Sequence, residues 1–238
     1  MMAGCSSNSS NSSTTSQAGY VNTDPIVVAT MTDTEGGILG QIILQLLAAN
    51  NFKVEDQTQT LAGTTLLRSA ATLRQATIIL DYTGNGMYIM EEVGDRVWND
   101  FDKGWERIRD YDKEKNNLVW LSPSHANNTE LLAVTKKFAE ENNIKDMYDF
   151  AAYVNNGGYL KMAAPQYWVN EEGGLTALKE AYGFDLKPDQ LVISGRLMKE
   201  VAAGTDNFNC TMVFTTDGIL DELGLFVIPD PLNIPPIY

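Results

Sequence analysis

The sequence predicts an α/β fold with mostly parallel strands. Short β-branched or apolar runs alternate with stretches whose apolar residues recur at helical spacing. Polar, turn-forming loops follow several of the expected strands, and strands that alternate with helices form parallel sheets. With 238 residues, 44% of them hydrophobic, the chain is long enough to form one or two domains with a substantial core.

The first half of the chain predicts one group of strands and helices. Its first loop, residues 31–37, ends in residues suited to capping a helix, where free N–H groups and the helix dipole favour a polar or anionic ligand. The expected elements are a strand over residues 26–30, a helix over 38–47, a strand from Val54, a helix over 64–72, a strand over 78–80, a charged amphipathic segment over 98–117 and a strand over 118–121.

The second half predicts another group, bounded by two turn-rich segments that are candidate crossings between lobes. The expected elements are a crossing over residues 122–128, helices over 131–142 and 146–155, a strand over 159–163, a helix over 175–182, strands over 191–194 and 211–214, and a crossing over 215–218. The expected units are a disordered tether over residues 1–24, a first lobe from 25–124 plus 215–238, and a second lobe from 125–214.

Ligands bind at the carboxyl ends of parallel strands, and this places residues 31–35, 81–85 and 214–217 around one cleft. Aromatic residues occupy several of the loops concerned, and aromatic faces bind desolvated cations, quaternary ammonium above all. Tyr82, the pair Tyr167 and Trp168, and Phe214 are candidates for such contacts. Ordinary core packing is the alternative for each, and the better interpretation for Trp120.

Charge and hydropathy exclude several classes of function. The chain has 17 Lys and Arg residues and 31 Asp and Glu residues. The resulting net charge of −14 disfavours nucleic acid as a partner. The apolar runs are all far shorter than the roughly 20 residues that a membrane-spanning helix needs.

The N-terminal sequence predicts a lipid anchor. Small residues precede Cys5, and a tract of Ser, Asn and Thr over residues 6–17 follows it, as in a bacterial lipoprotein processing site and its tether. This predicts lipidation at Cys5 and a location at the outer face of the bacterial cell membrane. The apolar stretch of a signal peptide is missing and Met2 stands where Leu is usual, so the sequence is expected to begin inside that peptide. The alternative is a disordered N-terminus with an incidental thiol.

Catalytic patterns are sparse. His125 is the only histidine, and the nucleophile-elbow, zinc-protease and phosphate-loop motifs are missing from the sequence. The two cysteines, Cys5 and Cys210, lie at opposite ends of the chain, which disfavours a disulfide or a cysteine-rich metal site. The expected activity is therefore binding, without a metal, a cofactor or a reaction.

Six short segments in order carry a family resemblance. From about residue 25 to 238 the chain resembles the glycine betaine, choline and proline type substrate-binding proteins of ABC importers. The matching segments are Thr34-Glu35 with Ile38-Leu39-Gly40, Asp81-Tyr82-Thr83-Gly84, Asn127-Asn128-Thr129, Gly174-Leu175 with Ala181-Tyr182-Gly183-Phe184, Phe214-Thr215-Thr216-Asp217-Gly218, and Pro235-Pro236.

The resemblance implies a type II periplasmic-binding fold of two lobes with two crossovers, closing on a small ligand. It also implies a membrane permease as partner, with membrane attachment only through the lipid anchor. Family members continue beyond Pro236 with helices that complete the first lobe, so a truncated sequence and a short variant are both open. A sensing or scaffold domain that kept the fold without a transport role is the alternative function.

The resemblance assigns ligand-binding roles residue by residue. Tyr82 and Phe214 match aromatic positions of the family's ammonium box, and Asn128 matches a backbone carbonyl beside it. Other positions depart from the family. Glu130 replaces a tyrosine, Met31 a lysine, Asn85 a threonine, and Glu171 or Asn170 an arginine, while another expected tyrosine falls near Met198 or Lys199.

These departures predict a ligand without a carboxylate. A carboxylate would lose its Lys and Arg partners and meet Glu130 and Glu171, whereas a cation would be attracted. The hypothesis is a choline-like or amine ligand in preference to glycine betaine, with Trp168 as a further contact. Two alternatives stay open: an alignment slip near Glu171 and Lys199, and recognition of a carboxylate by Asn85 and loop N–H groups.

Overall fold

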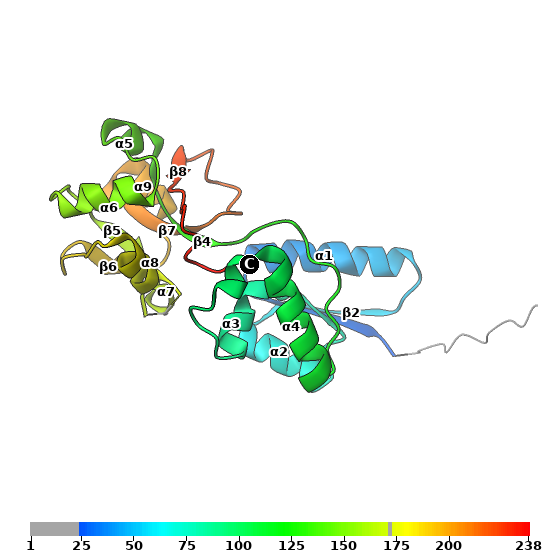
Figure 1. Cartoon of the computed structure of the whole chain (residues 1–238). Helices are drawn as coiled ribbons and strands as arrows, with labels where there is room; N and C mark the ends of the chain where they lie inside the picture. The colour runs from blue at the N-terminus through cyan, green and yellow to red at the C-terminus, as the bar shows by residue number, and fades with distance from the viewer. Residues whose placement is uncertain (1–23, 171–172) are drawn as a thin grey trace, which may run out of the picture.

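The computed structural model describes residues 24–170 and 173–238, and it has two lobes joined side by side (Figure 1). The first lobe holds a three-stranded parallel sheet in the order β2-β1-β3. The second holds a five-stranded sheet in the order β6-β5-β7-β4-β8, in which β5 runs parallel to β6 and β7 while β4 runs antiparallel to β7 and β8. The predicted α/β class with parallel-rich sheets is confirmed.

The first lobe follows the predicted alternation of strands and helices. The buried run of β1 pairs with a strand on each side, and helix α2 packs Leu67 against Ala29 of β1. The elements are β1 (Ile26–Met31), α1 (Thr34–Ala49), β2 (Val54–Leu61), α2 (Thr64–Thr72), β3 (Ile78–Ile79), a 3-10 turn (Thr83–Asn85), α3 (Gly86–Ile89), a second 3-10 turn (Arg96–Asn99) and α4 (Phe101–Lys115).

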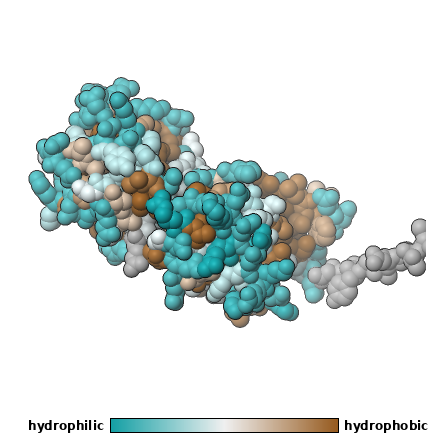
Figure 2. Space-filling view, viewed as in Figure 1, coloured by the Kyte–Doolittle hydropathy of each residue, from teal (hydrophilic) through white to brown (hydrophobic). Residues whose placement is uncertain are grey.

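Helix α1 packs its glycine face against the sheet. A Cβ on Gly40 would lie 2.5 Å from Cγ2 of Thr58, so only glycine permits this close approach to β2. The apolar side chains at helical spacing therefore point outward, with Ile38 58% and Leu46 60% exposed. Figure 2 shows apolar side chains gathered over the end of the first lobe where α1 lies.

A buried ion triad ties three elements of the first lobe together. The guanidinium of Arg68, on α2, donates to Asp81 at 2.8 Å and also contacts Asp112 of α4. The fully buried Asp112 carboxylate also accepts from Asn116 at 2.7 Å and from the indole N–H of Trp120 at 2.6 Å. Buried charges need this degree of pairing, because an unpaired one loses its hydration without compensation.

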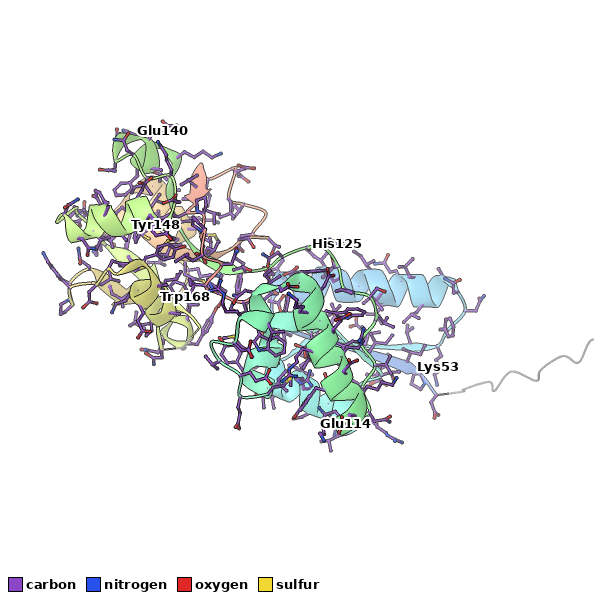
Figure 3. The ribbon with its side chains drawn as sticks, in the orientation of Figure 1. Lys53, Glu114, His125, Glu140, Tyr148 and Trp168 are labelled. Carbon is purple, nitrogen blue, oxygen red and sulfur yellow. The ribbon has the colours of Figure 1, made fainter. Side chains whose placement is uncertain are left out.

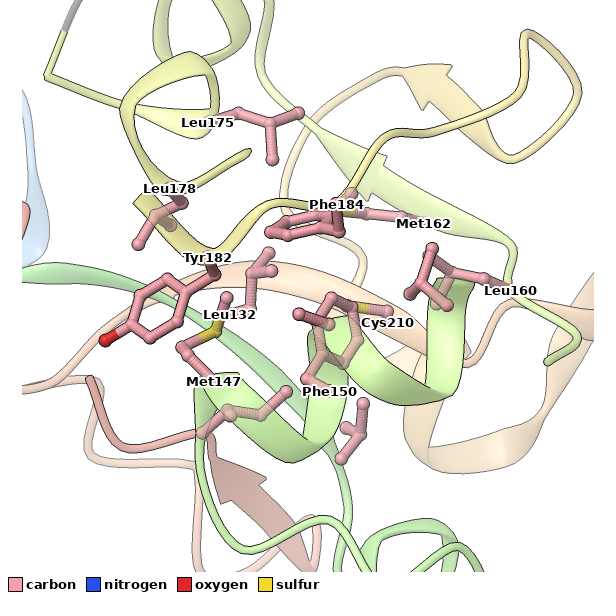
Figure 4. Packing of buried hydrophobic residues seen from close by; sticks show 14 of the residues in the cluster. Leu132, Met147, Phe150, Leu160, Met162, Leu175, Leu178, Tyr182, Phe184 and Cys210 are labelled. Carbon is pink, nitrogen blue, oxygen red and sulfur yellow. The ribbon is translucent and has the colours of Figure 1, made fainter. Parts of the chain in front are cut away.

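The second lobe surrounds the larger hydrophobic core. Helices α6 and α8 bring Phe150 and Leu178 onto strands β4 and β5, where Leu132 and Met162 are fully buried (Figure 4). The elements are β4 (Glu130–Thr135), α5 (Lys136–Glu141), α6 (Met147–Asn155), β5 (Met162–Ala164), α7 (Gln166–Asn170), α8 (Leu175–Tyr182), β6 (Leu191–Ile193), α9 (Met198–Ala203), a 3-10 turn (Thr205–Asn207), β7 (Cys210–Phe214) and β8 (Leu225–Val227).

Two secondary-structure predictions are wrong. Residues 131–135, expected in a helix, belong to β4, because pairing with β7 and β8 buries this apolar segment inside the sheet; the helix starts only after Thr135, whose hydroxyl accepts from the N–H of Phe138. Residues 118–121, expected to be a strand, form none: Val119 and Leu121 are 79% and 78% exposed, and Trp120 alone turns inward, to Asp112.

The chain passes between the lobes at residues 122–129 and again at about 232–238. The two segments lie side by side, since Thr129 Oγ1 donates to the Pro236 carbonyl at 3.1 Å and the Asn128 N–H to the Tyr238 carbonyl at 3.3 Å. Gly84 permits the tail's approach to the first lobe, because a Cβ there would lie 2.8 Å from the Ile237 carbonyl oxygen.

The second crossing lies later in the chain than predicted. Residues 215–238 were all expected in the first lobe, but β8 pairs with β4 inside the five-stranded sheet, so residues 225–227 belong to the second lobe. Thr215–Gly218, expected to be the crossing, turns back within that lobe. We propose that residues 25–124 form the first lobe.

None of the helices within residues 24–170 and 173–238 is long and apolar enough to cross a membrane.

Truncating Asp112 tests the ion triad. Asp112→Ala leaves the Arg68 guanidinium, the Asn116 amide and the Trp120 N–H short of a buried acceptor, so the free energy of unfolding is expected to fall by about 3–5 kcal/mol. Urea denaturation measures it. Asp110→Ala is the matched control on α4, because its pair with Arg109 is screened by solvent, and the free energy of unfolding is expected to stay nearly unchanged. Equal losses in the two variants would contradict a structural role for the triad.

Candidate functional site

A cavity of about 940 Å³ lies between the two lobes. The first lobe contributes the loops after β1 and β3 and the start of α1, and the second contributes β4, α7 and the loop after β7. The residues that line it include Met31, Asp33, Glu35, Thr64, Tyr82, Asn85, Asn128, Glu130, Tyr167, Arg196, Phe214, Thr216, Asp217 and Tyr238. The three loop segments expected around one cleft therefore share one cavity.

The N-terminus of α1 presents two carboxylates to this cavity. Asp33 caps the helix by accepting from the Gly36 N–H at 2.6 Å, and Glu35 lies in the first turn. Both are stabilised there by the helix dipole. Glu35 accepts from the Tyr82 hydroxyl at 3.1 Å and, across the cavity, from the Thr216 hydroxyl at 3.5 Å. Two carboxylates of the protein therefore occupy the helix end that would otherwise suit an anionic ligand.

Tyr82 forms an aromatic wall on the first-lobe side. Burial, followed by the nearby charges of Glu35 and Asp33, raises the pKa of its hydroxyl, so the phenol stays protonated and continues to donate to Glu35. Its ring meets the Tyr238 ring edge to face, with centroids 6.0 Å apart. Two aromatic rings from different segments thus meet beside the carboxylates.

The second-lobe wall places a carboxylate beside an aromatic ring. Glu130 lies opposite Phe214 in the β4 to β7 register, is 7% exposed, and accepts from the Tyr167 hydroxyl at 2.7 Å. Arg196 covers one face of the Phe214 ring, with its guanidinium carbon 4.7 Å from the centroid, and pairs with Asp217. The guanidinium in this wall is therefore already neutralised.

Asn85 lies at the base of the first-lobe wall. Its side-chain nitrogen donates to Asp81 Oδ1 at 2.8 Å and to Thr64 Oγ1 at 3.0 Å. Burial raises the pKa of the Asp81 carboxyl, and the Arg68 guanidinium and the Asn85 amide oppose that rise. The ion triad thus reaches the cavity through Asn85.

Six predicted site residues line the cavity: Met31, Tyr82, Asn85, Asn128, Glu130 and Phe214. Their roles in binding remain predictions. Trp168 is a correction, because it is fully buried in the second-lobe core (Figure 3). Successive residues of a helix point about 100° apart, so on α7 its neighbour Tyr167 faces the cavity instead. Glu171 and Cys5 lie outside the described residues.

Three of these lining residues, Thr64, Arg196 and Tyr238, were not predicted from the sequence. Tyr238 reaches the cavity only because the tail pairs with the crossing at Asn128, and no local pattern marks that contact. Arg196 lies in the segment before α9. Its partner Asp217 belongs to the Thr-Thr-Asp-Gly segment that the sequence singled out, but no local pattern predicts that the two side chains pair. His125, the single histidine, stacks on Phe101 with ring centroids 5.2 Å apart.

Comparison with known proteins connects this cavity to a family. The sequence profile described as the substrate binding domain of ABC-type glycine betaine transport systems matches residues 24–237. The chain is 36% identical over 219 residues to the glycine betaine-binding protein YehZ of Escherichia coli K12, covering 90% of this chain and 72% of that protein. It is 26% identical to a glycine-betaine-binding protein of Pseudomonas aeruginosa, covering 93% and 71%.

Solved structures agree with this assignment. The structure of apo YehZ from Escherichia coli superposes with a TM-score of 0.71 at 35% identity, covering 90% of this chain and 78% of that one. A glycine betaine/carnitine/choline ABC transporter structure gives a TM-score of 0.72 over 89% of this chain and 77% of that one; at 20% identity this likeness concerns the fold alone. The chain belongs to the family of substrate-binding domains of ABC-type glycine betaine transport systems.

Proposed function

We propose that the cavity captures a small cation, a quaternary ammonium ion or an amine, and takes a choline-like ligand in preference to glycine betaine. A substrate-binding domain of this family delivers its ligand to the membrane permease of an ABC importer. The proposal rests on the cavity charge: among the described lining residues Asp33, Glu35, Glu130 and Asp217 are acidic and Arg196 is basic.

The aromatic residues supply the second part of the recognition. Tyr82, Tyr167 and Tyr238 come from different segments and line the same cavity as Glu35 and Glu130. A ring face attracts a cation through its quadrupole, by about 0.5–1 kcal/mol at exposed sites and about 2 kcal/mol when the cation is desolvated. An ammonium group between such rings and the two carboxylates would be attracted by both.

A carboxylate-bearing ligand finds fewer partners here. Met31 lies where the resemblance implies a lysine, and its sulfur accepts only a weak contact from Thr64 at 3.9 Å. Arg196 pairs with Asp217 and stacks on Phe214, so a betaine carboxylate must compete with an existing partner. The relatives named as glycine betaine-binding proteins support the quaternary ammonium class. The residues of this chain support a ligand without the acid group.

Glu130→Gln tests the charge argument. The amide can still accept from the Tyr167 hydroxyl, so the variant removes a charge and keeps the hydrogen bond. Choline is expected to bind about tenfold more weakly, because a close carboxylate near a protein surface contributes on the order of a few kcal/mol before solvation costs. Glycine betaine is expected to lose less, since its own carboxylate is no longer repelled. Isothermal titration calorimetry gives both values.

The matched control is Glu140→Gln. Glu140 is an exposed carboxylate on α5 of the same lobe, far from the cavity (Figure 3), and this change should leave both affinities unaltered. Unchanged choline affinity in Glu130→Gln, or an equal loss in both variants, would contradict the proposal.

We also propose that Cys5 carries a lipid anchor. In the cell that makes the protein, Cys5→Ser is expected to abolish incorporation of labelled palmitate, because the thioether to the lipid forms at that sulfur. Cys210→Ala should keep the label, since Cys210 is fully buried in β7. Label retained in Cys5→Ser, or absent from the unaltered chain, would rule the anchor out.

A further inference from the structure

The side chain of Asn85 has one hydrogen-bonding atom left for the cavity. An asparagine amide carries two hydrogens and one acceptor oxygen. Both hydrogens are used, one on Asp81 Oδ1 at 2.8 Å and one on Thr64 Oγ1 at 3.0 Å. Among residues 24–170 and 173–238, no donor forms a hydrogen bond to Asn85 Oδ1.

The orientation of this amide is fixed by its partners. Both oxygens of Asp81 already accept hydrogen bonds, Oδ2 from Arg68 and Oδ1 from the Tyr82 N–H, so Asp81 presents an acceptor to Asn85. The Thr64 hydroxyl directs its proton toward the sulfur of Met31, so its oxygen also accepts. Turning the amide over would set an oxygen against two acceptors, a repulsive arrangement.

We infer that Asn85 selects ligands that donate a hydrogen bond, so the preferred ligand is an ammonium ion that also carries a hydroxyl or N–H group. This inference rests on the proposed function, and it identifies the uncharged group that the proposed cationic ligand carries. Asn85 stands where the resemblance implies a threonine, whose hydroxyl can serve either a donor or an acceptor. A carboxylate has no proton to give and would face the lone pairs of Asn85 Oδ1, so recognition of a betaine acid group by this amide is excluded.

Four ligands allow the effect of the ligand's positive charge to be measured separately from the effect of its hydrogen-bond donor. Choline and its O-methyl ether share the cation but differ in the hydroxyl proton. Their uncharged carbon isosteres, 3,3-dimethylbutan-1-ol and its methyl ether, differ in the same way. In calorimetric titration each alcohol is expected to bind about tenfold more tightly than its ether, the factor that one hydrogen bond of about 1.4 kcal/mol represents. A cavity of about 940 Å³ has room for the added methyl group.

Asn85→Ala assigns the preference to this residue. Water replaces the amide in the variant, and because water both donates and accepts, the alcohol and ether affinities should come within about twofold of each other. Asn50→Ala is the control, an exposed asparagine at the end of α1, and should keep the tenfold ratio.

The amide hydrogens give a test that needs no ligand. In ¹⁵N-labelled protein the Asn85 side-chain signals, assigned by their loss in Asn85→Ala, should exchange with solvent at least tenfold more slowly than those of exposed asparagines. Exchange at the exposed rate would overturn the inference.

The titrations separate the two proposals. An ether that binds as tightly as its alcohol overturns the role of Asn85 and leaves the cation site standing. Uncharged ligands that bind as tightly as the charged pair overturn the cation site, while a retained preference for the alcohol supports Asn85. Failure of all four ligands to bind contradicts both.

Discussion

The cavity depends on one buried interaction, the Arg68 guanidinium between Asp81 and Asp112. Asp81 follows β3, Arg68 lies on α2 and Asp112 on α4, so the triad fixes the carboxyl end of the parallel sheet against two helices. Tyr82 and Asn85 lie within four residues of Asp81 and take their positions from it, through the Tyr82 N–H and the Asn85 amide. A charged network with well-matched partners rigidifies its surroundings, and the first-lobe wall of the cavity therefore rests on an ion cluster whose three residues do not themselves line the cavity.

The second lobe brings a matching wall by a different route. Its sheet register places Glu130 beside Phe214, and the loop after β7 brings Thr216 within 3.5 Å of Glu35 in the first lobe. The contact between Glu35 and Thr216 across the cavity is polar, while the two crossing segments are tied to each other by backbone and side-chain hydrogen bonds. Such an arrangement suits two lobes that open and close about a paired hinge. If the ligand is a cation, as proposed, it would offset the repulsion between the carboxylates of the two walls when the lobes close.

The sequence was informative where local pattern and fold agree. Alternating strands and helices predicted the α/β class, and the strand ends predicted the loops of Met31, Tyr82 and Phe214 that now line one cavity. It failed where long-range contacts decide. Residues 131–135 look helical alone, yet sheet pairing on both sides makes them a strand. Trp168 and Tyr167 are adjacent aromatics, and only the packing of α7 shows which enters the core. Tyr238 reaches the cavity because the tail contacts residues more than one hundred positions earlier in the sequence, such as Asn127. No local sequence pattern predicts contacts of this kind.

The proposed ligand preference depends on the sign of the cavity charge. Calorimetric displacement of glycine betaine by choline from the unaltered protein at neutral pH tests this dependence, because the two ligands share the trimethylammonium group and differ in the group at the other end. Choline is expected to displace glycine betaine and to bind at least tenfold more tightly. Equal affinities, or tighter binding of glycine betaine, would show that a carboxylate finds partners in this cavity and would rule out selection by the cavity charge.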